Sequence, residues 1–292
     1  MSIANTLIQH IEEYVPTKFS PIYNIYRWWN PPQAEFLAKL KSAIKTVEDD
    51  AVVQLLTVSF CRIVIELSNA AFNHVSTSFK DDNEGFFSID IAKEAFISVC
   101  EMVAKGALLQ PRATSKVLLH DSRSIPAECY GAYDTVIASP PYPNRISYIR
   151  ELRPYMYWLE YLERSDQASD LDWQAIGGTW GRATSLLGTW KSDHSLPQYV
   201  YDIAEKISNA DNKSAGLMAN YVLKYFEDMQ KHLSSVYAGL AAKGRVFYII
   251  GNSNFYNITV PAEKIYVDMM TTIGFVDVKY HIVRKRNSNK QL

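Results

Sequence analysis

Three short apolar runs in the second half of the chain constrain the fold most strongly. They lie at 116–120, 134–138 and 245–250, and polar or small residues follow each of them directly: Asp121 and Ser122, Ser139, and Gly251 and Asn252. Continuous apolar runs bounded by such residues predict buried parallel strands. Because helical patterns alternate with them, we expect an α/β fold with a partial Rossmann-like sheet. Ligands bind at the carboxyl ends of such strands, so these polar residues are expected to share one site.

Amphipathic segments around these runs predict the helices. We expect helices at about 32–45, 51–72, 91–105, 146–163, 195–208, 214–242 and 262–273, and a last strand at 276–287. The chain therefore divides into a helical N-terminal region, 1–110, and a catalytic region, 111–292. Residues of about 165–213 are rich in Gly, Ser, Asp and Trp and are predicted to form an irregular insertion.

Composition narrows the class of protein. Lys and Arg total 30 against 31 Asp and Glu, a formal net charge of −1, whereas proteins that carry nucleic acid over their whole surface are usually more basic. A local basic groove is still compatible with this balance. The cysteines Cys61, Cys100 and Cys129 are far apart, and the six histidines lack metal-ligand spacing. We expect no metal site, no disulfide framework and no signal peptide, which together indicate a cytoplasmic protein.

The sequence Ser139-Pro140-Pro141-Tyr142 carries the most specific chemistry. Two prolines remove two backbone donors and fix the chain, so the carbonyl of Pro140 becomes a rigidly aimed acceptor. Ser139 adds a second acceptor oxygen, and Tyr142 offers a flat face for stacking. Such a turn can hold an exocyclic aromatic amine in plane. Hydrogen bonds from both amine hydrogens would withdraw its lone pair from the ring and make the nitrogen nucleophilic.

This stretch resembles the S-adenosylmethionine-dependent amino-methyltransferases of DNA. Their signature is Asp, Asn or Ser followed by Pro-Pro and an aromatic residue at the end of a central strand, and the Ser form is typical of cytosine-N4 enzymes. The likeness spans about 26–290 and is most specific at 116–162. It implies that Ser139 to Pro141 hold the target amine, that Tyr142 stacks on an extruded base, and that Asp121 and Ser122 lie near the cofactor's adenosine. It also implies DNA as a partner and a restriction–modification setting.

Each of these assignments has a purely structural alternative. Pro-Pro pairs are common in loops, but the apolar run before this one and the helix expected after it favour the functional interpretation. Asp121 can equally be a helix cap or turn former. For the arginines that follow the turn, Arg145, Arg150 and Arg153, phosphate binding and a solvated helix face paired with Glu151 stay equally open.

Two further groups of residues leave the choice between binding and structure open. Trp173, Trp180 and Trp190 lie beside Arg182 and Lys191, and they form either a DNA-facing surface or the packing of a long loop. The chain ends in Lys279, Arg284, Lys285, Arg286 and Lys290, which form either a phosphate-contacting end or a solvated one.

One expected element is missing from the sequence. Methyltransferases of this type carry a glycine-rich turn, Asp-Pro-Phe-x-Gly-x-Gly, where the backbone approaches the cofactor. The densest glycine cluster here, Gly177-Gly178, follows Asp172 and Trp173 rather than an apolar run. We therefore predict a split enzyme, in which a second polypeptide carries the glycine-rich S-adenosylmethionine-binding loop. The alternatives are a degenerate remnant, a loop of unreadable form, an amino-methyltransferase of adenine or of an RNA base, and a non-catalytic subunit that positions nucleic acid.

Overall fold

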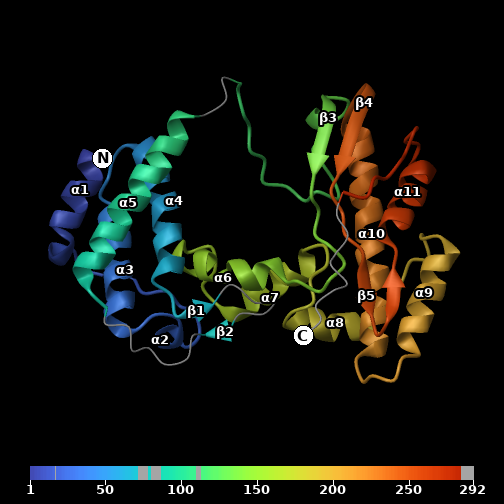
Figure 1. Ribbon diagram of the computed structural model, residues 1–292, viewed down its shortest axis with the longest axis horizontal. Helices are drawn as coiled ribbons and strands as arrows, with labels where there is room; N and C mark the ends of the chain where they lie inside the picture. The colour runs from blue at the N-terminus through green and yellow to red at the C-terminus, as the bar shows by residue number, and fades with distance from the viewer. Residues whose placement is uncertain (17, 72–77, 80–86, 110–112, 284–292) are drawn as a thin grey trace. The chain divides into compact units, whose positions relative to one another are not determined.

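The chain divides into two compact units. The computed structural model describes residues 1–16, 18–71, 78–79, 87–109 and 113–283. Contacts group Met1–Lys116 with Tyr148–Ala168 in the first unit, and Val117–Ser147 with Ser169–Leu292 in the second. The described residues are mostly helical with a few short strands, so the fold class is mixed α and β (Figure 1). Among them, no helix combines the length and the apolar character that crossing a membrane requires.

The first unit is helical, as the sequence predicts. It contains α1 (Ser2–Gln9), η1 (Ile11–Glu13), α2 (Ile25–Trp28), α3 (Pro31–Ile44), α4 (Asp50–Glu66), the antiparallel strands β1 (Ala70–Ala71) and β2 (Ser78–Phe79), α5 (Ile89–Leu108) and α6 (Tyr148–Trp158). The helices expected at 32–45, 51–72 and 91–105 are confirmed as α3, α4 and α5, although α4 ends earlier, at Glu66. The helix expected at 146–163 is the shorter α6.

Local sequence signals explain where these helices begin. Asn30 and Gln33 form a capping box at the start of α3. Asp49 accepts a 3.0 Å hydrogen bond from the amide of Val52 at the start of α4. In the core of this unit Trp29 is fully buried, and its indole nitrogen donates a 2.8 Å hydrogen bond to the carbonyl of Val64. The buried donor is therefore satisfied.

The second unit combines helices with short strands. It contains η2 (Ala127–Cys129), β3 (Tyr133–Ala138), the end of α7 (Ser165–Gln174), α8 (Arg182–Thr189), α9 (Gln198–Ser208), α10 (Ala215–Gly239), β4 (Leu240–Tyr248), β5 (Ser253–Phe255), β6 (Ile258–Val260) and α11 (Ala262–Ile273). The strands expected at 134–138 and 245–250 are confirmed as β3 and β4, and the helices expected at 214–242 and 262–273 as α10 and α11.

The strands β3 and β4 form a parallel pair that positions the candidate site. Val136 lies opposite Val246, and Ile137 opposite Phe247. Tyr248, at the end of β4, packs on the core that α10 and α11 share. On the other face Ile137 is 76% and Phe247 51% exposed. Both strands run toward the same end, so the residues after Ala138 and after Tyr248 are neighbours.

Two expected strands are not formed in the described residues. The run at 116–120 is extended but unpaired, and Val117 and Leu119 are 95% and 102% exposed. The described part of the expected last strand, 276–283, is also unpaired, and 284–287 lies outside the described residues. An apolar run becomes a strand only when another strand lies beside it, and the described residues offer these two runs no partner.

The segment at 165–213 is more regular than the sequence suggested. The expectation of an irregular insertion is wrong for the residues that form α7 and α8, whereas the helix expected at 195–208 is confirmed as α9. A side chain supports the start of α7, since Gln167 accepts hydrogen bonds from the amides of Glu163 and Arg164. The hairpin of β5 and β6 was not predicted at all, because its strands are only three residues long.

Candidate functional site

The turn Ser139–Tyr142 follows β3 directly and lies at the carboxyl end of the parallel pair. The ring of Pro140 is buried, whereas Ser139 is exposed. The hydroxyl oxygens of Ser139 and Tyr142 are 3.3 Å apart, so both side chains lie on the same side of the turn. No described residue donates a hydrogen bond to the carbonyl of Pro140. The turn thus offers two acceptors beside a phenol ring, as the sequence predicts.

A buried tyrosine pair holds the turn from behind. The hydroxyl of Tyr225, on α10, donates a 2.6 Å hydrogen bond to the carbonyl of Pro141. The hydroxyl of Tyr266, on α11, lies 3.0 Å from that of Tyr225. Both rings are buried, and burial raises the pKa of Tyr266. Because the Tyr225 hydroxyl donates to it, the carbonyl of Pro141 is occupied, and that of Pro140 is the acceptor left for a ligand.

Gly251 brings the end of β4 against the turn. A Cβ atom at Gly251 would lie 3.4 Å from the ring of Tyr142. At this distance a methyl group would be in van der Waals contact with the ring, so the backbone at Gly251 lies close to Tyr142. The neighbouring carboxyl ends of the two strands therefore meet as the parallel topology predicts.

His232, on α10, connects the segment of Asp121 and Ser122 with β4. Its Nδ1 lies 3.0 Å from the carbonyl oxygen of Ser122, and its Nε2 lies 2.6 Å from the hydroxyl of Tyr248. A carbonyl only accepts, so Nδ1 carries the proton and Tyr248 donates to Nε2. Burial lowers the pKa of His232, partly opposed by the bond to Ser122. A neutral histidine thus holds Ser122 next to the sheet.

The carboxylate of Asp121 is engaged within the protein. The Nε and Nη2 atoms of Arg123 donate to both oxygens of Asp121, at 2.8–3.2 Å. Arg123 also donates a 3.0 Å hydrogen bond to the nearly buried Asp228. Hydrogen bonding to Arg123 lowers the pKa of the Asp121 carboxyl despite some burial. Arg123 therefore links Asp121 to Asp228, which lies on α10.

The contacts of Asp121, Ser122 and the nearby glycines show whether these residues are available to bind S-adenosylmethionine. Asp121 is committed to Arg123, and the carbonyl of Ser122 to His232. Gly251 packs on Tyr142. Gly178 packs so closely on Asp172 that a Cβ atom there would overlap the Asp172 carbonyl oxygen. The described residues thus use their site-side glycines and acids for internal packing, and they do not form a cradle for this cofactor.

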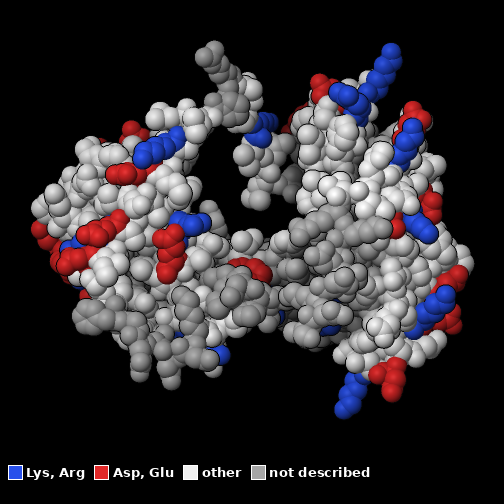
Figure 2. Space-filling view, viewed as in Figure 1, with Lys and Arg blue, Asp and Glu red and all other residues white. Residues whose placement is uncertain are grey.

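The predicted phosphate-binding arginines fall into different surroundings. Arg145 lies in the second unit, three residues after the turn, and is exposed. Arg150 and Arg153 belong to the first unit, where Arg150 lies 3.9 Å from Glu151 and the guanidinium of Arg153 lies over the ring of Trp28. Arg182 forms a 2.6 Å ion pair with Asp170. Figure 2 shows basic and acidic side chains interspersed over the visible face.

The tryptophan-rich segment contributes to packing in the second unit. The side chain of Lys224 lies 4.7 Å above the ring of Trp173. The amide of Trp180 donates a 2.7 Å hydrogen bond to the buried carboxylate of Asp172. Of the C-terminal basic residues, Lys279 is described, and Arg284, Lys285, Arg286 and Lys290 lie outside the described residues.

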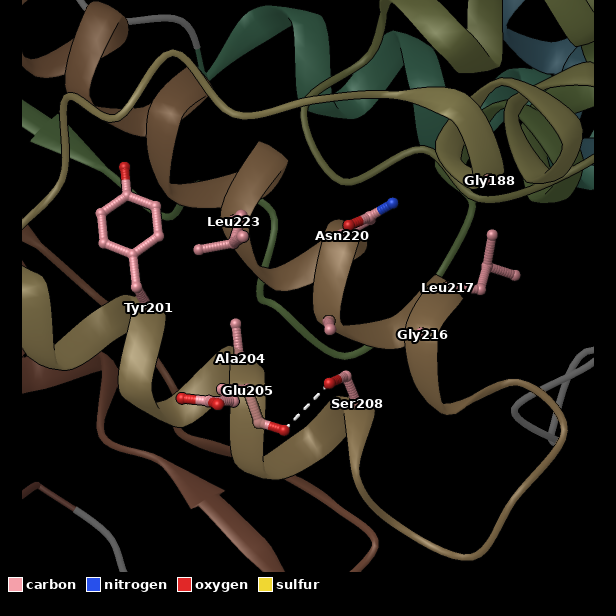
Figure 3. A pocket seen from close by; sticks show the side chains of 10 residues that line it. Gly188, Tyr201, Ala204, Glu205, Ser208, Gly216, Leu217, Asn220 and Leu223 are labelled. Carbon is pink, nitrogen blue, oxygen red and sulfur yellow. Dashed lines mark hydrogen bonds between the residues drawn. The ribbon is translucent and has the colours of Figure 1, made fainter.

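One groove lies away from the predicted site residues. It has a volume of about 540 Å³ and lies between α9 and α10, lined by Tyr201 and Ala204 on one side and Leu217 and Leu223 on the other (Figure 3). The Ser208 hydroxyl at its edge donates to the carbonyl of Glu205. None of the residues singled out from the sequence lines this groove.

Sequence reasoning missed Tyr225, Tyr266, Tyr248 and His232. Their positions on α10, β4 and α11 indicate only that they face a core. The hydroxyl of Tyr225 finds its acceptor 84 residues earlier in the chain, and such a pairing leaves no local signal.

No family model matches the chain, and no curated protein and no solved structure is significantly similar to it. The functional argument therefore depends on the geometry of the turn and its surroundings.

Proposed function

We propose that this chain is the amine-binding subunit of a two-chain, S-adenosylmethionine-dependent methyltransferase that acts on the exocyclic amine of cytosine in DNA. One observation carries the proposal. The Ser139–Tyr142 turn lies at the carboxyl end of a parallel strand. Its Ser139 hydroxyl and Pro140 carbonyl can accept hydrogen bonds beside the Tyr142 ring, and the carbonyl of Pro141 accepts a hydrogen bond from Tyr225.

In this proposal each residue of the turn has one task. The Ser139 hydroxyl and the Pro140 carbonyl accept the two amine hydrogens, while the Tyr142 ring stacks on the extruded base. The hydrogen bond from Tyr225 fixes the turn before the base arrives, so little ordering is left to occur on binding. The amine is thereby oriented, and its lone pair is drawn toward the direction of attack.

The partner supplies the cofactor site. Asp121 is paired with Arg123, and Gly178 and Gly251 pack against Asp172 and Tyr142, so S-adenosylmethionine, the methyl donor, would be held by a second polypeptide with a glycine-rich turn. The same observations also favour a second candidate function, a non-catalytic subunit that positions nucleic acid for an enzyme.

The test reconstitutes the two chains. We would co-express this chain with a neighbouring-gene product that carries a strand followed by a glycine-rich turn, and measure the methylated nucleosides of added DNA. We expect N4-methylcytosine from the pair and none from either chain alone. Ser139→Ala should slow the reaction about 100-fold, because one preorganised partner of the amine is lost.

Three outcomes would change the proposal. Methyl transfer by the isolated chain would refute the two-chain version. Full activity of the Ser139→Ala complex would assign the chain to non-catalytic positioning. Methylated adenine or a methylated RNA base in place of N4-methylcytosine would change the substrate. Ser208→Ala, remote in sequence and bonded on α9, is the matched control.

A further inference from the structure

A second, smaller pocket lies directly after the Ser139–Tyr142 turn. It has a volume of about 290 Å³ and is lined by Asn144, Arg145, Ser253, Asn254, Phe255 and Tyr256. The first two residues follow the turn, and the amide of Asn144 donates a 2.7 Å hydrogen bond to the carbonyl of Tyr142. The other four come from the β5–β6 hairpin. The pocket and the turn are thus joined through the backbone.

The hydroxyl of Ser253 is buried at this pocket without a partner. Ser253 is 7% exposed, and its Oγ atom has no hydrogen bond to any described residue. A buried hydroxyl that makes no hydrogen bond lowers the stability of the folded chain. A ligand oxygen in the pocket would remove that cost.

The remaining polar groups of the pocket are donors. The Oδ1 atom of Asn144 accepts from the amide of Ile146, and the Oδ1 atom of Asn254 accepts from the Thr259 hydroxyl. Each Oδ1 atom therefore already accepts one hydrogen bond, and the NH₂ group of each side chain donates to no described residue. Arg145 has no ion pair with any described residue, and no carboxylate lines the pocket. Such a set of donors selects an anion with several acceptor oxygens.

Two residues of the pocket have an unfavourable backbone conformation that their surroundings hold in place. Arg145 has φ 64° and Tyr256 has φ 52°, both in the left-handed region. For a residue with a side chain this region is energetically unfavourable. The Arg145 amide is held at 3.1 Å by the hydroxyl of Tyr221, and the Tyr256 hydroxyl at 3.2 Å by Asn212. The surrounding structure therefore fixes both conformations.

We propose that this pocket binds a backbone phosphate of the nucleic-acid strand whose base lies at Ser139. Arg145, Ser253 and the two asparagine amides donate to the phosphate oxygens, and Phe255 and Tyr256 form the apolar wall beside the sugar. The choice of a nucleic acid over a free phosphate rests on the proposed function. The preference for a phosphate oxygen rests on the pocket itself. A phosphate contact next to the turn fixes the register of the strand without reading its sequence.

The test measures binding of the full chain to a fluorescently labelled single-stranded oligodeoxynucleotide by anisotropy, over a range of salt concentrations. Arg145→Gln should raise Kd about 10-fold and reduce the slope of log Kd against log salt by about 1. Ser253→Ala should raise Kd about 3- to 10-fold with the slope unchanged, because a neutral hydrogen bond is lost. Arg62→Gln, which breaks an exposed pair with Glu66 on α4, and Ser208→Ala are the controls.

Two further measurements separate the sources of the phosphate. An oligonucleotide with neutral methylphosphonate linkages should bind the wild type no better than the unmodified strand binds Arg145→Gln. Inorganic phosphate at millimolar concentration should compete weakly with the wild type. Arg145→Lys, which keeps the charge, should retain part of the affinity, and it replaces Arg145→Gln if circular dichroism shows that Gln unfolds the chain.

Two results would overturn the inference. One is wild-type affinity and salt slope in both Arg145→Gln and Ser253→Ala. The other is inorganic phosphate binding more tightly than the oligonucleotide. Because no methyl transfer is measured, weaker binding by these variants would sustain the pocket even if reconstituted methylation failed. Successful methylation by the reconstituted pair, together with unchanged oligonucleotide binding by both variants, would reject the phosphate pocket and leave the proposed function standing.

Discussion

The hydroxyl of Tyr225 donates a 2.6 Å hydrogen bond to the carbonyl oxygen of Pro141. This bond joins the centre of α10 to the turn that ends β3, and it occupies one of the two proline carbonyls. Tyr225, which is far from the turn in the sequence, therefore leaves the carbonyl of Pro140 as the acceptor available to a ligand.

Replacing Tyr225 with Phe should loosen the turn. The carbonyl of Pro141 would lose its donor, so we expect the free energy of unfolding to fall by about 1–2 kcal/mol. Hydrogen exchange at the Asn144 amide, which bonds the carbonyl of Tyr142 in the same turn, should become faster. Urea unfolding and exchange followed by NMR measure the two effects.

Tyr199→Phe is the matched control for this prediction. It removes an exposed bond to Asp268 and should change stability by less, with no effect on the exchange of Asn144. Equal effects of the two substitutions would show that Tyr225 has no special role in holding the turn.

His232 should make stability depend on pH below neutrality. Burial lowers its pKa in the folded chain from the ordinary value of 6.5, so the unfolded chain takes up the proton first. The free energy of unfolding should therefore fall as the pH drops from about 6.5 to the lower folded value, and stay level below it. NMR titration of the His232 ring gives the pKa directly. A titration midpoint above 6.5 would contradict the buried, neutral histidine described above.

Glu160 should contribute stability that acid removes. Hydrogen bonds from Lys41 and Lys45, at 2.9 and 3.0 Å, lower the pKa of its carboxyl to about 2. The contribution is complete above the unfolded value of about 4.5 and is lost as the pH falls toward 2. We expect Glu160→Gln to cost about 1–2 kcal/mol at pH 7, since solvent screens part of the pair and burial opposes the charge of Lys41.

Urea unfolding curves of Glu160→Gln and the wild type at several pH values measure how much stability Glu160 contributes at each pH. The difference between them should shrink below pH 4.5. A constant difference down to pH 2 would mean that packing, and not the ion pairs, accounts for the effect.

The glycines of the second unit should respond in opposite ways to a methyl group. A Cβ atom at Gly178 would overlap the backbone of Asp172, so Gly178→Ala should destabilise the fold by about 2–4 kcal/mol. Gly188 lies inside α8 with open space around its Cα, and Gly188→Ala should stabilise the fold by about 0.5–1 kcal/mol. Thermal unfolding of both variants measures the contrast. Tolerance of Ala at Gly178 would show that the packing against Asp172 is not tight.

The sequence by itself determined the helices of the first unit, the strands β3 and β4, and the position of the Ser139–Tyr142 turn directly after β3. Caps, apolar periodicity and paired prolines act over a few residues, so local sequence carries them. Tertiary structure alone decided that the run at 116–120 is not a strand, that Asp121 pairs with Arg123, and that Tyr225 and Ser253 stand beside the turn. Strand pairing, ion pairing and hydroxyl partners depend on residues distant along the chain. Their energies arise only once packing brings those residues within a few ångströms of each other.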